Sequence, residues 1–173
     1  MQQPYRNKLD KTGECSATGL NAEDLFYKIL SKKGDIRRAT RNEQIKHIDL
    51  ILTADGKTTS FDVKAMKKAS RSHVEVSSEL VWLEFKNIAG NLGWMLAESL
   101  DFLAFEREKD FVVVDRKLLL ELSLKICDLT KIVKSSSQAL YSSYTRWGRA
   151  DQISQIKMSD ILSIQHEVWE KII

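Results

Sequence analysis

The chain has 173 residues, of which 43% are hydrophobic and 29% charged, and its formal net charge is +3. These proportions are typical of a globular protein and exclude a wholly disordered chain, while 7 Gly and 1 Pro exclude collagen-like and proline-rich architectures. The sequence contains no apolar stretch of the roughly 18 residues that a membrane span needs, and Met1 to Leu9 lacks the apolar segment of a signal peptide. Cys15 and Cys127 are far apart and show no CxxC spacing. We therefore expect a cytoplasmic protein with free thiols and no membrane contact.

Charge is distributed unevenly along the chain. Residues 32–72 carry 11 Lys and Arg against 5 Asp and Glu, whereas residues 73–130 carry 6 against 11. A basic tract beside an acidic one favours a nucleic-acid contact face. A solvated charged surface is the alternative interpretation.

The N-terminal part of the chain predicts an arm followed by a helix. Residues 1–17 are polar and aperiodic, so we expect an irregular arm. Asn21 can cap a helix, apolar residues follow at helical spacing, and Gly34 ends the pattern. The spacing predicts a helix over about 21–33, and a short strand is expected over 36–40.

Two β-rich runs, 48–52 and 58–64, flank Asp55-Gly56, and this is the strongest short-range signal for a β-hairpin. Four more strands are predicted over 80–85, 93–96, 102–105 and 111–114. A helix over 116–127, an aperiodic Ser-rich segment over 128–150 and a final helix over 159–169, capped by Ser159, follow them. This order of elements predicts a single α+β domain with a central mixed, mostly antiparallel sheet flanked by helices.

The hairpin defines a candidate site. If Asp55 and Gly56 occupy the two turn positions, Asp49 lies opposite Asp62, and His47 lies opposite Lys64 on the same face. The other face is apolar and carries Ile48, Leu50, Leu52, Phe61 and Val63. One face of the sheet therefore gathers two carboxylates, a lysine and a histidine.

Two carboxylates directly opposite each other repel, so something must offset the repulsion. Mg²⁺ suits a site with few carboxylates, completed by waters and phosphate oxygens, and such an ion can polarise a phosphodiester and activate a water. We therefore predict that Asp49 and Asp62 bind Mg²⁺, for which Mn²⁺ can substitute, and that Lys64 holds the attacking water or stabilises the transition-state charge. The alternative is a polar outer face without chemistry, and a register change of one residue would separate the two carboxylates.

One pattern in the sequence resembles the signature of the PD-(D/E)XK nuclease superfamily: Asp49 is followed, after a gap of twelve residues, by Asp62-Val63-Lys64. The resemblance spans about residues 18–68, because Glu23 in the first helix is similar to the additional Glu of that family. It implies a restriction-endonuclease-like core and a metal-dependent DNA endonuclease. By this resemblance Asp49 and Asp62 are metal ligands, Lys64 is the catalytic lysine and Glu23 is a weaker third carboxylate.

The sequence departs from the family pattern in two places. Ile48 stands where the family often has Pro, and Asp62 stands where many members have Glu. Neither change removes a metal ligand. The order of elements is similar to that in archaeal Holliday-junction resolvases and in small phage or mobile-element endonucleases, and a homodimer is expected by analogy alone.

Further residues are candidates for contact with DNA. The basic residues after the catalytic triplet, Lys67, Lys68 and Arg71, would contact the nucleic-acid backbone, and His47 would position a phosphate or water. The segment 128–150, which we expect to be mobile, contains an aromatic-basic cluster that would stack on unpaired bases or pack back onto the sheet. The cluster consists of Tyr141, Tyr144, Arg146, Trp147 and Arg149. Two other functions stay open: a non-catalytic nucleic-acid-binding protein on the same fold, and an interaction protein whose acidic tract binds a basic partner.

Overall fold

The computed structural model describes residues 14–67 and 77–171. The first half contains α1 (Glu14–Leu30), β1 (Asp35–Arg38), α2 (Arg41–Gln44), β2 (Leu50–Ala54), β3 (Lys57–Lys64) and β4 (Leu80–Lys86). The 3₁₀ turn η1 (Trp94–Leu96), β5 (Phe102–Glu106), β6 (Asp110–Asp115) and α3 (Arg116–Ile126) follow. The last part contains β7 (Asp128–Val133), η2 (Ser136–Gln138), β8 (Ser142–Tyr144), β9 (Gln152–Lys157), α4 (Met158–Ile161) and β10 (His166–Glu170).

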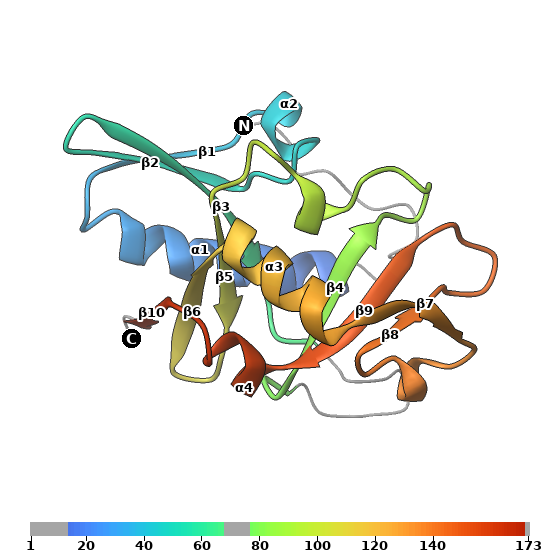
Figure 1. The fold of residues 1–173 in the computed structure, drawn as a ribbon. Coiled ribbons are helices and arrows are strands. Elements are labelled where there is room, and N and C mark those ends of the chain that lie inside the picture. The colour runs from blue at the N-terminus through green and yellow to red at the C-terminus, as the bar shows by residue number, and fades with distance from the viewer. Residues whose placement is uncertain (1–13, 68–76, 172–173) are drawn as a thin grey trace.

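The strands form two sheets, which lie side by side in Figure 1. The first has six strands in the order β1-β2-β3-β5-β6-β10, in which only the β3–β5 pair is parallel. The second has four strands in the order β4-β9-β8-β7. The predicted α+β class and the mixed, mostly antiparallel central sheet are thus confirmed, whereas the second sheet was not expected.

Helices cover both faces of the six-stranded sheet, with α1 on one side and α3 on the other (Figure 1). The apolar residues of α1 recur at helical spacing, and Phe26 packs its ring against Phe61 and Phe111 at centroid distances of 5.6 and 5.0 Å. On the other face, Leu119 of α3 belongs to the cluster that buries Leu103 of β5. Because both faces are buried, strands such as 111–114 are apolar at every position.

The hairpin forms in the predicted register. Leu50 pairs with Phe61 and Ala54 pairs with Lys57, so Asp55 and Gly56 are the two turn residues. Their φ values of 50° and 74° are those that a tight hairpin turn requires. One part of the predicted apolar face differs. Ile48 precedes β2 and packs in the cluster on the α3 side of the sheet rather than with Leu50.

Four expectations about secondary structure were wrong, at 14–17, 93–96, 128–150 and 159–169. Residues 14–17, which were expected in the irregular arm, belong to α1, because this helix begins at Glu14. The rest of the expected arm, residues 1–13, lies outside the described part of the chain. The strand expected over 93–96 is a 3₁₀ turn, in which the Leu96 amide donates to the Gly93 carbonyl (3.0 Å) and the Met95 carbonyl accepts from the Arg116 side chain. Residues 128–150 contain β7, η2 and β8.

The expected last helix is a single turn, α4, followed by the strand β10. In β10, Val168 pairs with Val112 and Trp169 with Phe111. This pairing with β6 favours a strand over a helix, and it depends on residues that lie far earlier in the chain. Among residues 14–67 and 77–171, no helix is long and apolar enough to cross a membrane.

Candidate functional site

The predicted carboxylates meet where β2 begins and β3 ends. The Asp49 amide donates to the Phe61 carbonyl (2.8 Å), which extends the hairpin ladder by one residue before β2. The Asp49 side chain crosses to the neighbouring strand, where its Oδ2 accepts a hydrogen bond from the Val63 amide (2.8 Å). This hydrogen bond fixes the Asp49 carboxylate beside the Asp62 backbone.

Asp62 and Lys64 form a buried ion pair on the covered face of β3. Asp62 is 3% exposed, and its Oδ2 lies 2.6 Å from Lys64 Nζ. This contact lacks hydrogen-bond geometry, and Oδ2 has no hydrogen-bond partner among the described residues. The ammonium group also lies 4.7 Å from the centroid of the Trp94 ring, so η1 covers Lys64 by a cation–π contact. Lys64 is therefore the positive partner of this buried carboxylate, and a metal ion at Asp62 would share the carboxylate with the ammonium group.

Glu23 joins this group from α1. Burial raises the pKa of Glu23, the nearby guanidinium of Arg38 opposes the rise, and the charge of Asp62 adds to it. Arg38 Nη1 lies 3.5 Å from Glu23 Oε2. Burial likewise raises the pKa of Asp49 well above its ordinary value, and the negative charges of Asp62 and Glu23 raise it further. Because their charges act on one another's pKa, the carboxylates of Glu23, Asp49 and Asp62 lie in one region, and Lys64 lies there with them.

The donor chemistry of this region fits Mg²⁺, because the available ligands are carboxylate oxygens. Within the described residues, however, no group of three His, Cys, Asp or Glu side chains is arranged to hold a metal ion. Asp49 and Asp62 alone would supply the protein ligands, with waters and phosphate oxygens completing the shell, as is common for Mg²⁺.

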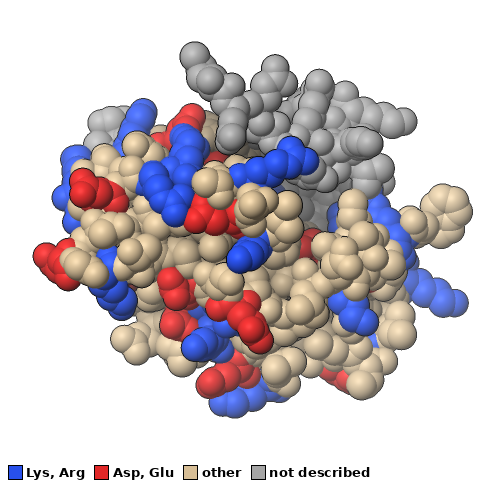
Figure 2. All heavy atoms as spheres, turned by 90° about the horizontal axis from the view of Figure 1, so that it is seen from above, with Lys and Arg blue, Asp and Glu red and all other residues tan. Residues whose placement is uncertain are grey.

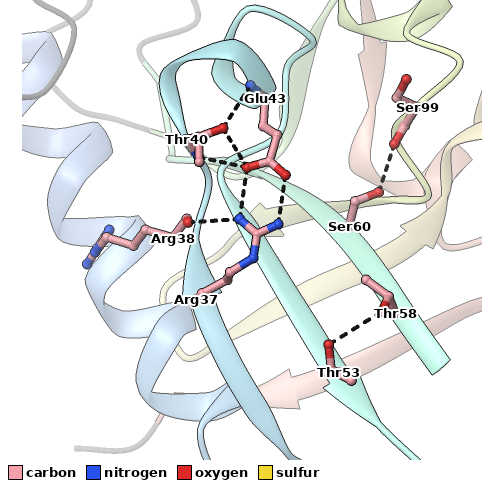
Figure 3. A network of polar contacts seen from close by, with 8 residues as sticks. All are labelled: Arg37, Arg38, Thr40, Glu43, Thr53, Thr58, Ser60 and Ser99. Atoms are coloured by element: carbon pink, nitrogen blue, oxygen red, sulfur yellow. Dashed lines mark hydrogen bonds and ion pairs between the residues drawn. The ribbon is translucent and has the colours of Figure 1, made fainter. Parts of the chain in front are cut away.

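The structure does not place His47 opposite Lys64. His47 lies in the turn after α2 with φ of 62°, outside β2, and its Nε2 is 3.3 Å from the Leu92 carbonyl. The cause is α2, because Thr40 and Glu43 form a reciprocal cap at its start. Arg37 binds both carboxylate oxygens of Glu43 at 2.7 and 2.8 Å, which ties α2 to β1 (Figure 3). This turn ends the strand pairing before His47.

Glu84 of β4 is a further carboxylate near the site, which sequence reasoning did not assign. Burial raises its pKa, and the positive charges of Lys64, His47, Lys67 and Arg146 oppose that rise. These four groups therefore lie near Glu84, although they come from three different segments of the chain. The only sequence signal is a single acidic residue in the otherwise apolar run 80–85.

The remaining residues predicted to contact DNA lie after β3 and in the β8–β9 loop, and two of them, Lys67 and Arg146, act on the charge of Glu84. Lys67 and Lys64 line a cleft that opens to solvent and is walled by Trp82 and Trp94. Arg146 lies in the β8–β9 loop and pairs with Asp151. Arg149, in the same loop, makes no ion pair with any described residue, whereas Lys68 and Arg71 lie outside the described part of the chain.

Basic side chains of the expected contact face are partly neutralised. In Figure 2, blue and red groups are interspersed over the described part of the face seen from above. Two side chains of the basic tract are also paired with carboxylates, Arg37 with Glu43 and Arg38 with Asp24. The basic tract of the sequence therefore does not produce a uniformly basic surface on this face.

No protein-family model, curated protein or solved structure matches the chain.

Proposed function

We propose that the protein is a metal-dependent DNA endonuclease of the PD-(D/E)XK type with a restriction-endonuclease-like core. The observation that carries the proposal is the buried Asp62 carboxylate, which is paired with Lys64 and lies close enough to Asp49 to raise the pKa of that carboxyl. A helix with Glu23 precedes the hairpin that carries the other three residues, which is the order of the family signature.

The proposed roles follow from the contacts of each side chain. Asp49 and Asp62 hold Mg²⁺ or Mn²⁺, which when bound supplies polarisation of the phosphodiester and neutralisation of its developing charge. Lys64, fixed between Asp62 and Trp94, orients the attacking water or stabilises the transition-state charge. Glu23 provides a third carboxylate at the border of the site, where Arg38 balances part of its charge.

The proposal is tested by cleavage of supercoiled plasmid and of a four-way DNA junction in Mg²⁺, in Mn²⁺ and in EDTA. We expect cutting with either metal and none in EDTA, and Asp62→Asn should slow cutting at least about a hundredfold. Asp55→Asn is the matched control, because Asp55 lies exposed in the turn of the same hairpin, with φ of 50° that Asn adopts readily.

A second readout does not depend on activity. A metal ion that binds only the folded chain raises its melting temperature, so Mn²⁺ should stabilise the wild type and Asp55→Asn but not Asp62→Asn. Cleavage by Asp62→Asn at the wild-type rate, in preparations free of other nucleases, would refute the assigned site.

A non-catalytic nucleic-acid-binding protein on the same fold is the second candidate. It is favoured by the lack, within the described residues, of a group of three side chains arranged to hold a metal ion. Tight DNA binding with neither metal-dependent cutting nor stabilisation by Mn²⁺ would select this function. For the nuclease we also propose a homodimer, since one site cuts one strand, and sedimentation of the protein with and without DNA tests it.

A further inference from the structure

The β8–β9 loop presents a tryptophan to solvent. Trp147 is 99% exposed, whereas Trp94 is 6% exposed and Trp82 is partly buried. Large aromatic side chains are seldom left fully in water, because their burial is strongly favourable. Among the described residues, Trp147 therefore offers an indole ring that is open to a contact.

The loop that holds Trp147 is itself well anchored. Asp151, which is 1% exposed, accepts hydrogen bonds from the Arg146 amide and from the Arg146 guanidinium. The Arg149 amide donates to the Arg146 carbonyl (3.1 Å), and Gly148 has φ of 69°, so residues 146–149 form a tight turn with Trp147 as its first central residue. The turn fixes the backbone so that the indole ring projects from the loop.

The other aromatic residues of the predicted cluster have structural roles. The Tyr141 hydroxyl donates to Asp160 (2.8 Å), and the Tyr144 ring packs against Trp82 at a centroid distance of 6.2 Å. Of the three aromatic residues in the segment 128–150, only Trp147 lacks a ring contact or hydrogen bond within the described chain.

The turn lies on the same side of the molecule as the candidate site. The Ala150 amide donates to the Ile88 carbonyl (3.2 Å), which joins the loop to the segment that connects β4 with η1. At the far end of that segment, η1 covers Lys64. The charges of Arg146 and Lys64 also act on the same carboxylate, Glu84. Figure 1 shows the β4–η1 and β8–β9 loops near each other at the upper right.

We propose that Trp147 stacks on an unpaired DNA base while Arg149 contacts the adjacent phosphate. The indole offers a free face for stacking, and Arg149 makes no ion pair with a described residue. Stacking on an aromatic ring requires a base that is not paired within a continuous duplex, so the substrate class is DNA with single-stranded or displaced bases. The inference deepens the proposed nuclease function, on which it rests for the identity of the ligand.

The test measures binding by fluorescence anisotropy in EDTA, so that no strand is cut. The probes are a labelled single strand, the matching duplex and the same duplex with a central unpaired bubble. Trp147→Ala should weaken binding to the single strand and the bubble about tenfold and leave duplex binding nearly unchanged. Trp147→Phe, which keeps an aromatic face, should restore most of the lost affinity.

Val168→Ala is the control, because Val168 is also exposed (46%) but lies on β10, an edge strand of the six-stranded sheet, whereas Trp147 lies in a loop of the other sheet. An equal loss of affinity for all three probes, or no loss for any of them, overturns the inference. Sedimentation provides a third outcome that overturns it, since a change in self-association in Trp147→Ala would assign the ring to a contact between copies.

The two proposals fail separately. Metal-dependent cutting by wild type together with unchanged binding by Trp147→Ala overturns only the stacking inference. Lost binding to unpaired probes without any cutting by wild type overturns only the nuclease.

Discussion

Gly93→Ala is the sharpest structural test of how the site is covered. A Cβ atom at position 93 would lie 2.3 Å from the Glu84 carbonyl oxygen and 2.7 Å from its carbonyl carbon. Non-bonded heavy atoms normally stay about 3.5 Å apart, so the backbone of β4 or of the segment before η1 must move by about 1 Å. The φ of Gly93 is −81°, so the conflict is steric and not conformational.

The cost follows from what that movement disturbs. Overpacking against a backbone that cannot rotate away costs about 3 kcal/mol, the upper part of the usual range. The hydrogen bond from the Gly93 amide to the Phe85 carbonyl (2.9 Å) would also weaken, at a cost of about 1 kcal/mol. A loss of about 4 kcal/mol lowers the melting temperature of a domain of this size by about 10 °C.

Urea and thermal unfolding of Gly93→Ala and Gly19→Ala measure this effect. Gly19 lies in α1, and a Cβ atom added there would meet no other atom within 4 Å, so Gly19→Ala should stabilise the helix by up to about 1 kcal/mol. The two identical substitutions should therefore change stability in opposite directions. In addition, DNA cutting by folded Gly93→Ala should be slower, because Trp94 follows directly and covers Lys64.

A Gly93→Ala protein as stable as the wild type would refute the close approach of this segment to β4. It would also remove the reason to regard η1 as a fixed cover over Lys64. Normal stability with reduced cutting would instead indicate that the cover moves without disturbing the core.

Two further predictions concern charge. Asp49→Asn keeps a side-chain oxygen that can accept the hydrogen bond from the Val63 amide. It removes a carboxyl group whose pKa is raised by burial and by the charges of Asp62 and Glu23. The variant should therefore be more stable than wild type at pH 7 but should lose DNA cutting. A carboxyl group whose pKa is higher in the folded than in the unfolded protein lowers stability as pH rises above its ordinary value, and it has no such cost at lower pH. The difference in unfolding free energy between Asp49→Asn and wild type should therefore vanish below the ordinary pKa range of aspartate. An Asp49→Asn protein less stable than wild type at pH 7 contradicts this. Arg37 and Thr40 hold the pKa of Glu43 far below its ordinary value, so Glu43→Gln should destabilise the protein at neutral pH, and acid titration of both unfolding free energies should show the difference shrinking. A difference that is independent of pH would show that the Arg37–Glu43 pair does not stabilise α2.

The sequence was most informative where structure depends on neighbouring residues. The Asp55-Gly56 turn specified the hairpin register, and with it the adjacency of Asp49 and Asp62, because turn geometry and side-chain alternation are local. His47 was misplaced because the α2 turn, held by the side chains of Arg37 and Glu43, interrupts the strand pairing.

Features that depend on distant contacts were missed. The residues of β10 have a spacing that also suits a helix, and only the pairing with β6 makes them a strand. The cover of Trp94 over Lys64 and the position of Glu84 likewise arise from packing of β4 and η1 against the first sheet. Burial of the candidate site therefore was not predictable from the hairpin, although the adjacency of Asp49 and Asp62 was.

The edges of the six-stranded sheet bear on how this protein associates with itself. One edge, β1, is only four residues long and carries Asp35, Arg37 and Arg38, and the other edge, β10, carries Glu167 and Glu170. Short, charged edge strands resist pairing with strands of another chain. A second copy is therefore expected to dock elsewhere than along these two edges, so that association does not lengthen the six-stranded sheet.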